Sequence, residues 1–534
     1  MRFSLFKSNK SRTKKRVLQP ESLERRELFA GVDFSLSQGV LTITGTPGRD
    51  EITVYDSGSN FRFRDGFSST APSRYFPKSS ISSIRFFGGE GDDRFVHDTR
   101  SSIHAALPRT ELYGGGGNDR LFGSTKADVI RGGPGRDSLF GFEANDAIFA
   151  GDGNDYVYGG TGNDLLFGGR GSDRIYGENG NDILCGDADN DDLRGGNHND
   201  RLYGGGQSGD RFRPGHGSDA VSRSGCAVTA ITGDWDGNGT DDLGVYFGAE
   251  RAFVLIGASQ PYFQFGPANS KPLVGNWDGR GGDEVGVFYG SRGAGYYSFD
   301  TGTPGASGER SYQFGFATDT PLVGDWDGDR ADEFGVFRTY SSGGPRYFLD
   351  EGAYGWTGRT PGERGHQFGL IGDKPIVGDW NGDGIDELGV FRANSPGGSR
   401  YYLDEYNPRG GVAYARGWTG HLTSERYGYQ FGISGDVPLI GDWDRDGKDE
   451  FGVVRTAGNG LLYYYLDVGA RGWTGQYRDE LGHQFGLRGD VVLVGDWNGD
   501  RYSDFGVYRS SNGTFHVDNG SRGFDGRSPG ELGL

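Results

Sequence analysis

Between Gly114 and Ser222 the apolar residues follow a nine-residue period. Each period reads Gly-Gly-x-Gly-x-Asp-x-apolar-x, as in GGTGNDLLF from Gly159 and GGRGSDRIY from Gly168. The last three positions point outward, inward and outward, which predicts a short strand with one buried side chain. The glycines permit positive φ, so the first six residues can form a tight turn. One such repeat cannot bury its apolar side chain alone, and we therefore expect a stack of strands and turns.

The sixth position of this repeat supplies a candidate metal ligand. It is aspartate in every copy from Asp119 to Asp219, and a separate copy at 88–96 supplies Asp93. Turn carbonyls and carboxylates give oxygen-only ligands at short spacing, which suit Ca²⁺. We predict several Ca²⁺ ions between neighbouring turns, held by Asp93, Asp119, Asp137, Asp155, Asp164, Asp173, Asp182, Asp191, Asp200 and Asp219. We expect poor binding in three turns with two substitutions each: Ser124 and Lys126, Phe142 and Ala144, and Asp187 and Asp189.

The nonapeptide resembles the RTX calcium-binding repeat, and this resemblance implies a parallel β-roll. It covers roughly a fifth of the chain. A disordered glycine-rich tract is the alternative. Such a tract would not keep an apolar residue and an aspartate in fixed phase over about a hundred residues.

From about Cys226 to Leu534 four short apolar or aromatic runs recur with a longer period. One set comprises 321–323, 334–337, 347–350 and 367–369. Four strands per period of about 50 residues are typical of a β-propeller blade. Six periods predict about six blades, with 531–534 as a candidate strand to close the ring.

A Gly-Asp-Trp-Asp-Gly-Asp phrase or a variant opens each period, at intervals of 42 to 63 residues. Oxygen-bearing side chains at positions 1, 3, 5 and 9 around a glycine turn are typical of a calcium loop. The candidate ligands are Asp234, Asp236, Asn238, Asp242, Asp325, Asp327, Asp329, Glu333, Asp379, Asn381, Asp383, Glu387, Asp442, Asp444, Asp446, Glu450, Asp496, Asn498, Asp500 and Asp504. Arg280 removes one ligand from the second copy. The alternative is that these acids only cap turns.

These phrases resemble the FG-GAP or VCBS repeat of integrin-type propellers over about 300 residues. We expect the tryptophan of each phrase, such as Trp235, to pack between blades. Trp356, Trp418 and Trp473 follow the third strand, where they either pack or stack on sugars.

The pattern predicts four segments: a basic leader or disordered tail (1–31), an irregular β-solenoid cap (32–113), an RTX roll (114–224) and a propeller (225–534). The run from Gln19 to Ala30 resembles the leader of exported planctomycete proteins. A small independent sandwich is the alternative for the cap.

Composition narrows the class of protein. A net charge of −19 argues against a nucleic-acid partner. The sequence has no apolar run long enough for a transmembrane helix. Cys185 and Cys226 form no disulfide framework, and we expect two unpaired residues, with Cys185 on the roll surface. A disulfide between the two is the alternative.

No catalytic motif is found in the sequence. We therefore expect an all-β, non-enzymatic adhesion or structural protein, located outside the cell or on its surface. Calcium is the expected ligand, with extracellular polysaccharide or cell-surface proteins as candidate partners. A lectin-like module and an enzyme acting on polysaccharides or phosphate esters are the alternatives.

Overall fold

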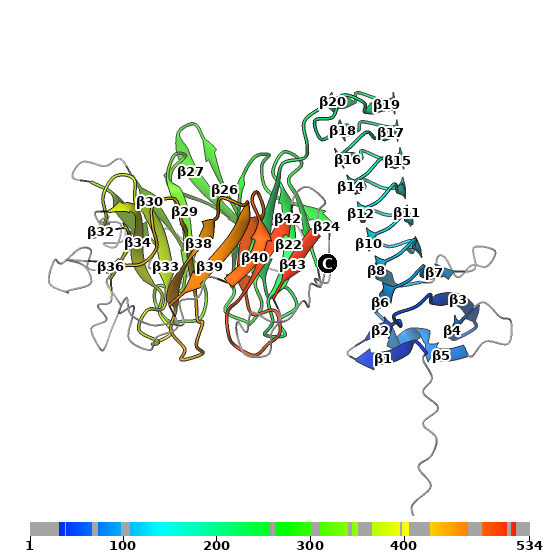
Figure 1. The fold of residues 1–534 in the computed structure, drawn as a ribbon, viewed down its shortest axis with the longest axis horizontal. Helices are drawn as coiled ribbons and strands as arrows, with labels where there is room; N and C mark the ends of the chain where they lie inside the picture. Colours follow the sequence, from blue (N-terminus) through cyan, green and yellow to red (C-terminus); the bar gives the residue numbers. More distant parts are fainter. Residues whose placement is uncertain are drawn as a thin grey trace, which may run out of the picture.

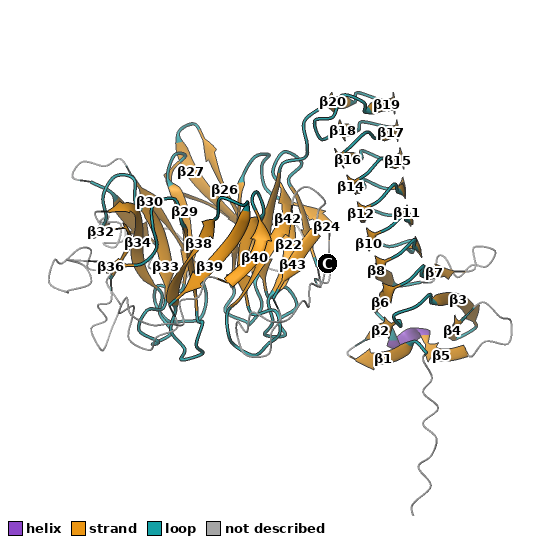
Figure 2. Ribbon diagram, in the orientation of Figure 1, coloured by secondary structure: helices purple, strands orange, loops and turns teal. Residues whose placement is uncertain are grey.

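The computed structural model describes residues 31–37, 39–66, 73–97, 107–256, 258, 262–300, 310–339, 344–350, 366–395, 398–404, 428–467, 483–509 and 514–518. Strands make up almost all of the regular structure, and a 3-10 turn at Lys78–Ser80 is the exception among these residues (Figure 2). No helix in this part of the chain is long and apolar enough to span a membrane. The expected leader, the closing strand at 531–534, and Trp356, Trp418 and Trp473 lie outside the described residues.

The first half of the chain forms two ten-stranded sheets stacked into a roll (Figure 1). The sheet nearer the second half of the chain is called the propeller-facing sheet, and the other is called the outer sheet. The propeller-facing sheet contains β1 (Asp33–Ser37), β2 (Val40–Thr44), β6 (Ser83–Glu90), β8 (Arg109–Gly116), β10 (Val129–Pro134), β12 (Ala147–Asp152), β14 (Leu165–Arg170), β16 (Ile183–Ala188), β18 (Arg201–Tyr203) and β20 (Ala220–Ser222).

The outer sheet contains β5 (Ser73–Pro77), β4 (Asn60–Asp65), β3 (Glu51–Ser57), β7 (Arg94–His97), β9 (Arg120–Phe122), β11 (Ser138–Glu143), β13 (Tyr156–Thr161), β15 (Arg174–Asn179), β17 (Asp192–Asn197) and β19 (Arg211–His216). Neighbouring strands run parallel in both sheets except at the N-terminal end. There β1 pairs with β2, β3 with β4, and β4 with β5 in the antiparallel direction.

Two nonapeptides make one turn of the roll. Val129 pairs with Ala147, and Ala147 pairs with Leu165, so consecutive strands of one sheet are 18 residues apart. The eighth position of most repeats fills the core, as predicted: Leu139, Ile148 and Val157 are fully buried. At the C-terminal end of the roll Phe212 is half-buried and Val221 is exposed. This confirms the predicted β-roll.

The second half of the chain forms six blades around a ring (Figure 1). The strands, blade by blade, are β21 (Val228–Gly233), β22 (Asp242–Phe247), β23 (Ala252–Leu255) and β24 (Tyr262–Gln264); β25 (Lys271–Gly275), β26 (Glu284–Ser291), β27 (Ala294–Phe299) and β28 (Arg310–Phe316); β29 (Thr320–Gly324), β30 (Glu333–Arg338), β31 (Arg346–Leu349) and β32 (His366–Gln367); β33 (Lys374–Gly378), β34 (Glu387–Ser395), β35 (Gly398–Leu403) and β36 (Tyr429–Gln430); β37 (Val437–Gly441), β38 (Glu450–Thr456), β39 (Leu461–Leu466) and β40 (His483–Leu487); and β41 (Val491–Gly495), β42 (Asp504–Arg509) and β43 (Thr514–Val517).

The first strands of neighbouring blades lie side by side, and β21 also lies beside β41, so the ring is closed. The tryptophans of the repeated phrase help to pack it. Trp326 is buried in a cluster that joins Tyr347 of its own blade to Leu388 and Val390 of the next. The predicted six-bladed propeller is thereby confirmed.

The outward positions of the propeller-facing sheet are buried as well, which corrects the prediction of one buried side chain per repeat. Leu165, Phe167 and Ile183 share one apolar cluster with Val245 and Phe247 of the first blade. The rings of Phe167 and Phe247 lie 5.1 Å apart. Burying this face therefore requires the propeller.

The expectation of two unpaired cysteines is wrong. Cys185 is fully buried at the ninth position of its repeat and forms a disulfide with Cys226. Residue 226 lies two residues before β21, so the bond fixes the start of the propeller to β16, the eighth of the ten strands in the propeller-facing sheet. The hydroxyl of Tyr203 also donates to Glu250 Oε1 of the first blade at 2.7 Å.

Candidate calcium sites

The aspartates at the sixth position form two ladders along the roll. In one ladder the backbone N–H of Asp119 donates to Oδ1 of Asp137 at 2.7 Å, and the N–H of Asp137 donates to Oδ1 of Asp155 at 2.7 Å. In the other ladder Asp146, Asp164 and Asp182 repeat this contact at 2.9 Å. One carboxylate oxygen of each aspartate is therefore used to join successive turns.

The second oxygen of these aspartates is buried and has no hydrogen-bond partner in the described part of the chain. This holds for Oδ2 of Asp93, Asp119, Asp137, Asp146, Asp155, Asp164, Asp173, Asp182, Asp191, Asp200 and Asp210. A buried carboxylate oxygen without a partner is costly, and a cation is the partner that satisfies it. The recurrence along both ladders fits one row of cations at each edge of the roll.

Backbone carbonyls converge on the same space. A Cβ placed on Gly132 would lie 2.2 Å from Oδ2 of Asp137 and 2.6 Å from the carbonyl oxygen of Ala150 in the next turn. Gly114 has the same surroundings, formed by Asp119 and Gly132. The first glycine of the repeat therefore leaves room for a carboxylate and a carbonyl from neighbouring turns, and this all-oxygen donor set fits Ca²⁺.

Burial raises the pKa of these carboxyl groups. The pKa rises to about 9 for Asp137 and to about 8 for Asp173 and Asp182, chiefly because the charged form is desolvated. Neighbouring aspartates of the same ladder raise these three pKa values further. A bound divalent cation would reverse this effect by favouring the ionised form.

Asp128 differs from the other members of its ladder. Its Oδ2 accepts from the N–H of Ser124 at 2.5 Å, and its Oδ1 accepts from the N–H of Thr110 at 2.5 Å. Both oxygens are therefore occupied by protein donors. We expect no cation at Asp128, in agreement with the substitutions at Ser124 and Lys126.

Two residues absent from the predicted ligand set have the geometry of a ligand. Asp146 and Asp210 each present a buried Oδ2 without a partner among the described residues. In the turn before Asp146, Phe142 and Ala144 take the place of glycines and still adopt positive φ, 85° and 76°. The turn therefore keeps its shape, a result that residue identity alone did not predict.

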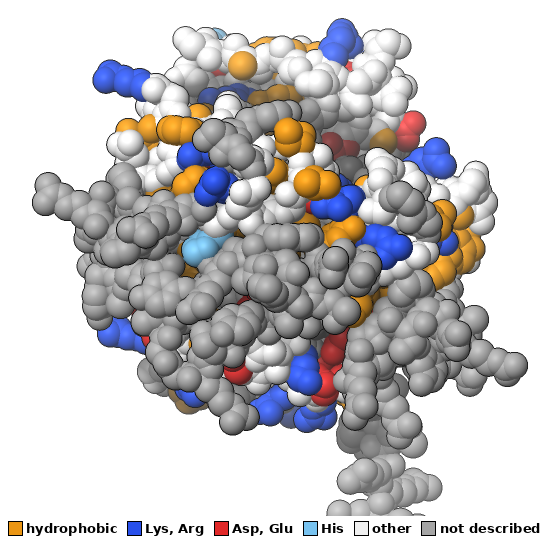
Figure 3. Space-filling view, turned by 90° about the vertical axis from the view of Figure 1, so that its left-hand side faces the viewer, with side chains coloured by type: hydrophobic (Ala, Val, Ile, Leu, Met, Phe, Trp, Pro, Cys, Tyr) orange, Lys and Arg blue, Asp and Glu red, His pale blue; other side chains and the backbone are white. Residues whose placement is uncertain are grey.

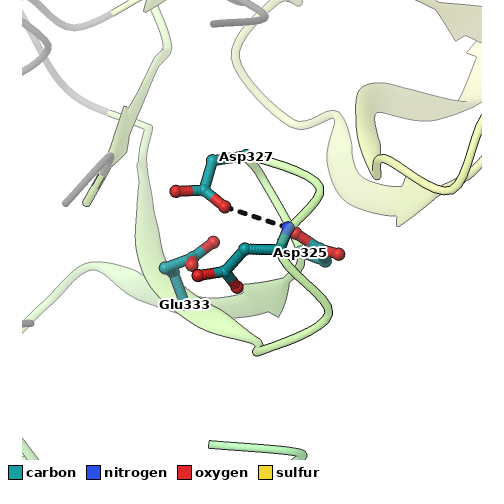
Figure 4. A group of neighbouring side chains, drawn as sticks. Asp325, Asp327 and Glu333 are labelled. Carbon is teal, nitrogen blue, oxygen red and sulfur yellow. Dashed lines mark hydrogen bonds between the residues drawn. The ribbon is translucent and has the colours of Figure 1, made fainter. Parts of the chain in front are cut away.

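The propeller loops bring most of their predicted ligands together. Asp325, Asp327, Asp329 and Glu333 each offer a carboxylate oxygen, and these oxygens lie within 4.8 Å of one another. Figure 4 shows Asp325, Asp327 and Glu333 turned toward a common centre. Equivalent groups are Asp442, Asp444, Asp446 and Glu450; Asp379, Asp383 and Glu387; and Asp234, Asp236 and Asp242.

The three predicted amide ligands make hydrogen bonds within their own loops. The amide nitrogen of Asn381 donates to Glu387 Oε1, the amide nitrogen of Asn498 donates to Asp504 at 3.0 Å, and Oδ1 of Asn238 accepts from the N–H of Thr240. In the last blade Asp496 accepts from the N–H of Arg501 at 2.8 Å, and Oδ2 of Asp500 is buried without a hydrogen-bond partner in the part of the chain that the structure describes. Among the described residues, neither this loop nor the second copy around Arg280 forms a comparable carboxylate group.

The acid at position 9 of these loops is the most strongly perturbed. Burial raises the pKa of Glu333, Glu387 and Glu450 to about 9, and the carboxylates of the same loop raise it further. Without a cation, the ionised carboxylates of these loops are therefore destabilised by burial and by one another, like the aspartates of the roll.

Comparison with known proteins supports the calcium sites of the roll. Overlapping segments between residues 113 and 209 match the family model of the RTX calcium-binding nonapeptide repeat. This part of the chain consists of RTX repeats. No curated protein matches the chain.

Five solved chains are similar to part of this chain. One of them is an Agrocybe aegerita lectin whose title describes recognition of non-reducing terminal N-acetylglucosamine. The identity is 13%, the match covers 56% of this chain and 78% of the lectin chain, and the TM-score is 0.31. At this TM-score the likeness supports no argument about the propeller.

Proposed function

We propose that this protein is a calcium-folded, extracellular structural or adhesion protein without catalytic activity. Its RTX roll takes up rows of Ca²⁺, and its propeller, fixed to the roll, serves as a platform for interaction. The observation that supports this proposal most strongly is the series of buried Oδ2 atoms along both edges of the roll, which have no hydrogen-bond partner among the described residues.

The electrostatics favour folding outside the cell. Without calcium, closely stacked aspartates disfavour the roll because their ionised forms are buried together. Extracellular calcium is millimolar, a range in which oxygen-ligand sites of this kind are loaded. The disulfide between Cys185 and Cys226 is also typical of an oxidising compartment.

The apolar interface links the roll to the propeller. Leu243, Val245 and Phe247 of the first blade and Phe515 of the sixth are buried in one cluster with side chains of the roll. A roll that is unfolded in the absence of calcium could not cover these side chains. We therefore propose that calcium controls the exposure of this edge of the propeller.

Far-UV circular dichroism in chelator and after addition of Ca²⁺ or Mg²⁺ tests this function. We expect a large gain of β signal with Ca²⁺ and a much smaller gain with Mg²⁺, because Mg²⁺ demands a tighter octahedral geometry. Binding of a dye specific for apolar surface should fall in parallel as the propeller edge is covered. A chelated protein with an unchanged β spectrum would reject calcium-driven folding.

A further inference from the structure

The outer sheet presents a basic and aromatic face to solvent. Its outward positions on β9, β11, β13, β15, β17 and β19 are Arg120, Phe122, Ser138, Phe140, Tyr156, Tyr158, Arg174, Tyr176, Asp192, Arg194, Arg211 and Arg213. All twelve are partly or fully exposed: five are arginine, five are aromatic and one is acidic. We call this set the arginine face. It lies on the side of the roll away from the propeller (Figure 1).

This face contrasts with the rest of the molecule. The chain has a net charge of −19. The corresponding positions of the propeller-facing sheet are mostly apolar and covered, as at Leu165 and Phe167. On the propeller surface seen in Figure 3, lysine and arginine side chains are scattered among apolar ones rather than gathered in one row. The arginine face is therefore a local exception to an acidic protein.

The aromatic rings support the arginines. Phe140, Tyr158 and Tyr176 form a continuous stack, with ring centroids 4.9 and 4.6 Å apart. The guanidinium carbons of Arg174 and Arg194 lie 5.0 and 4.8 Å from the ring centroids of Tyr156 and Tyr176. Stacking on a ring orders a guanidinium group. Arg174 donates to the hydroxyl of Tyr156 from one nitrogen, which leaves its remaining N–H donors available for a ligand.

Little of this positive charge is compensated within the face. Asp192 is its single acid, and it pairs with Arg194 at 2.7 Å and Arg213 at 3.4 Å. Arg120 and Arg174 are exposed, stack on aromatic rings and make no ion pair with any residue in the described part of the chain. Arg211 is also exposed and lies opposite Asp192 in the neighbouring strand, an acid that Arg194 and Arg213 already pair with.

We infer that the arginine face binds a linear polysaccharide that carries carboxylates. Guanidinium groups match carboxylates in a two-pronged geometry, and the exposed ring edges offer apolar contacts to sugar rings. The strands repeat every ~4.8 Å, a spacing similar to the length of one sugar in an extended chain. Such a polymer can therefore follow the roll axis and meet a similar surface at each turn.

Charge density favours a polysaccharide over nucleic acid. Duplex DNA carries about one negative charge per 1.7 Å of its axis, and an acidic protein repels it strongly. A carboxylated polysaccharide carries at most one carboxylate per sugar ring in its simple forms. It can satisfy the arginines of one narrow face with less repulsion from the rest of the molecule.

This inference rests on the proposed calcium-folded roll. The face exists only when the strands are stacked, and Ca²⁺ neutralises the aspartates that lie in the turns beside it. Binding is therefore expected to require Ca²⁺ and to weaken as salt rises, because the contacts are exposed.

The test measures binding of fluorescent hyaluronan fragments to the full chain in millimolar Ca²⁺. We expect the triple variant Arg120→Gln, Arg174→Gln and Arg211→Gln to bind about tenfold or more weakly. Arg251→Gln, Arg292→Gln and Arg488→Gln together make the matched control. These arginines are exposed on the propeller, so the charge change is the same. We expect less than about a twofold loss for the control.

Three results would overturn the inference: no binding by wild type, an equal loss in both variants, or tighter binding of duplex DNA than of hyaluronan at the same salt. Circular dichroism of the same samples separates the two proposals. A calcium-induced β spectrum without hyaluronan binding rejects the arginine face alone. Absence of that spectrum rejects the proposed function and this inference together.

Discussion

The carboxylate of Asp241 accepts a hydrogen bond from the backbone N–H of Asp496 at 2.7 Å, although 255 positions separate the two residues. The N–H of Asp241 donates in return to the carbonyl oxygen of Asp496 at 2.8 Å. This reciprocal pair joins the sixth blade to the first. Equivalent side chains join the other neighbouring blades: Asp283, Asp332, Asp386, Asp449 and Ser503.

Removal of this contact should weaken ring closure. Asp241→Ala leaves the N–H of Asp496 without its acceptor, and a hydrogen bond to a charged group contributes about 1.5–3 kcal/mol. Although burial raises its pKa to about 6, Asp241 remains mostly ionised at neutral pH. We expect lower stability in urea and faster amide exchange in β21 and β41.

Asp241→Ser is the control for this prediction. Ser503 already accepts from the N–H of Asp442 at 3.0 Å in the equivalent position. The serine variant should therefore lose less stability than the alanine variant. Equal stability of Asp241→Ala and wild type would contradict a role in ring closure.

Calcium uptake should depend on which aspartate is changed. Asp137→Asn removes a charge from an oxygen without a partner and should lower the number or affinity of bound ions. Asp128→Asn should leave the number unchanged, since both oxygens of Asp128 already accept from protein donors. Isothermal titration of the two variants measures this difference, and an equal loss in both would show that Asp128 is a ligand too.

The metal-free roll should become less stable as pH rises. Burial raises the pKa of Asp200 to about 6, of Asp119 to about 7 and of Asp137 to about 9, from an ordinary value of 3.8. Between the ordinary and the raised values the folded state holds more protons than the unfolded state. Stability therefore falls with rising pH across this window, from about pH 4 to pH 9.

Thermal unfolding in chelator, followed by circular dichroism, checks this pH dependence. Saturating Ca²⁺ should remove most of it, because the ion holds the carboxylates ionised, and calcium uptake near neutral pH should release protons. A metal-free roll that gains stability between pH 5 and pH 8 would contradict the assignment of the buried aspartates.

The disulfide should hold the start of the propeller against the roll. Replacement of Cys185 and Cys226 by serine should cost about 2–4 kcal/mol, the usual range for a native disulfide. It should also speed proteolytic cleavage near Ser222–Gly225, the segment just before Cys226. A wild-type protein treated with reductant should behave in the same way. Unaltered cleavage in both samples would show that the apolar interface alone maintains the contact.

The nonapeptide predicted much of the roll because each repeat contains both the apolar residue of the core and the glycines and aspartate of the turn. Leu139 and Val157 fill the interior and Asp137 lies in the turn, as the period required. The propeller followed in the same way from strands of fixed order around each Asp-Trp phrase.

What the sequence analysis missed depends on contacts between distant parts of the chain. Leu165 and Phe167 occupy the outward positions of β14, whereas Arg174 and Tyr176 occupy the outward positions of the next strand, β15. This 18-residue alternation marks a covered and an exposed sheet, but a nine-residue template hides it. Cys185 belongs to the covered set, and its pairing with Cys226 follows only once the propeller is placed there. Asp241 was missed because the acid beside it, Asp242, fits the ligand pattern.

The most direct test of calcium-driven folding is calcium titration of the chelated protein, with ion uptake measured by calorimetry and the β signal by circular dichroism on the same sample. Calcium-driven folding predicts cooperative uptake of many ions together with a large gain of β signal, and protection of the roll amides from exchange. Uptake of few ions, with a spectrum that does not change, would contradict it and show that the roll folds without metal.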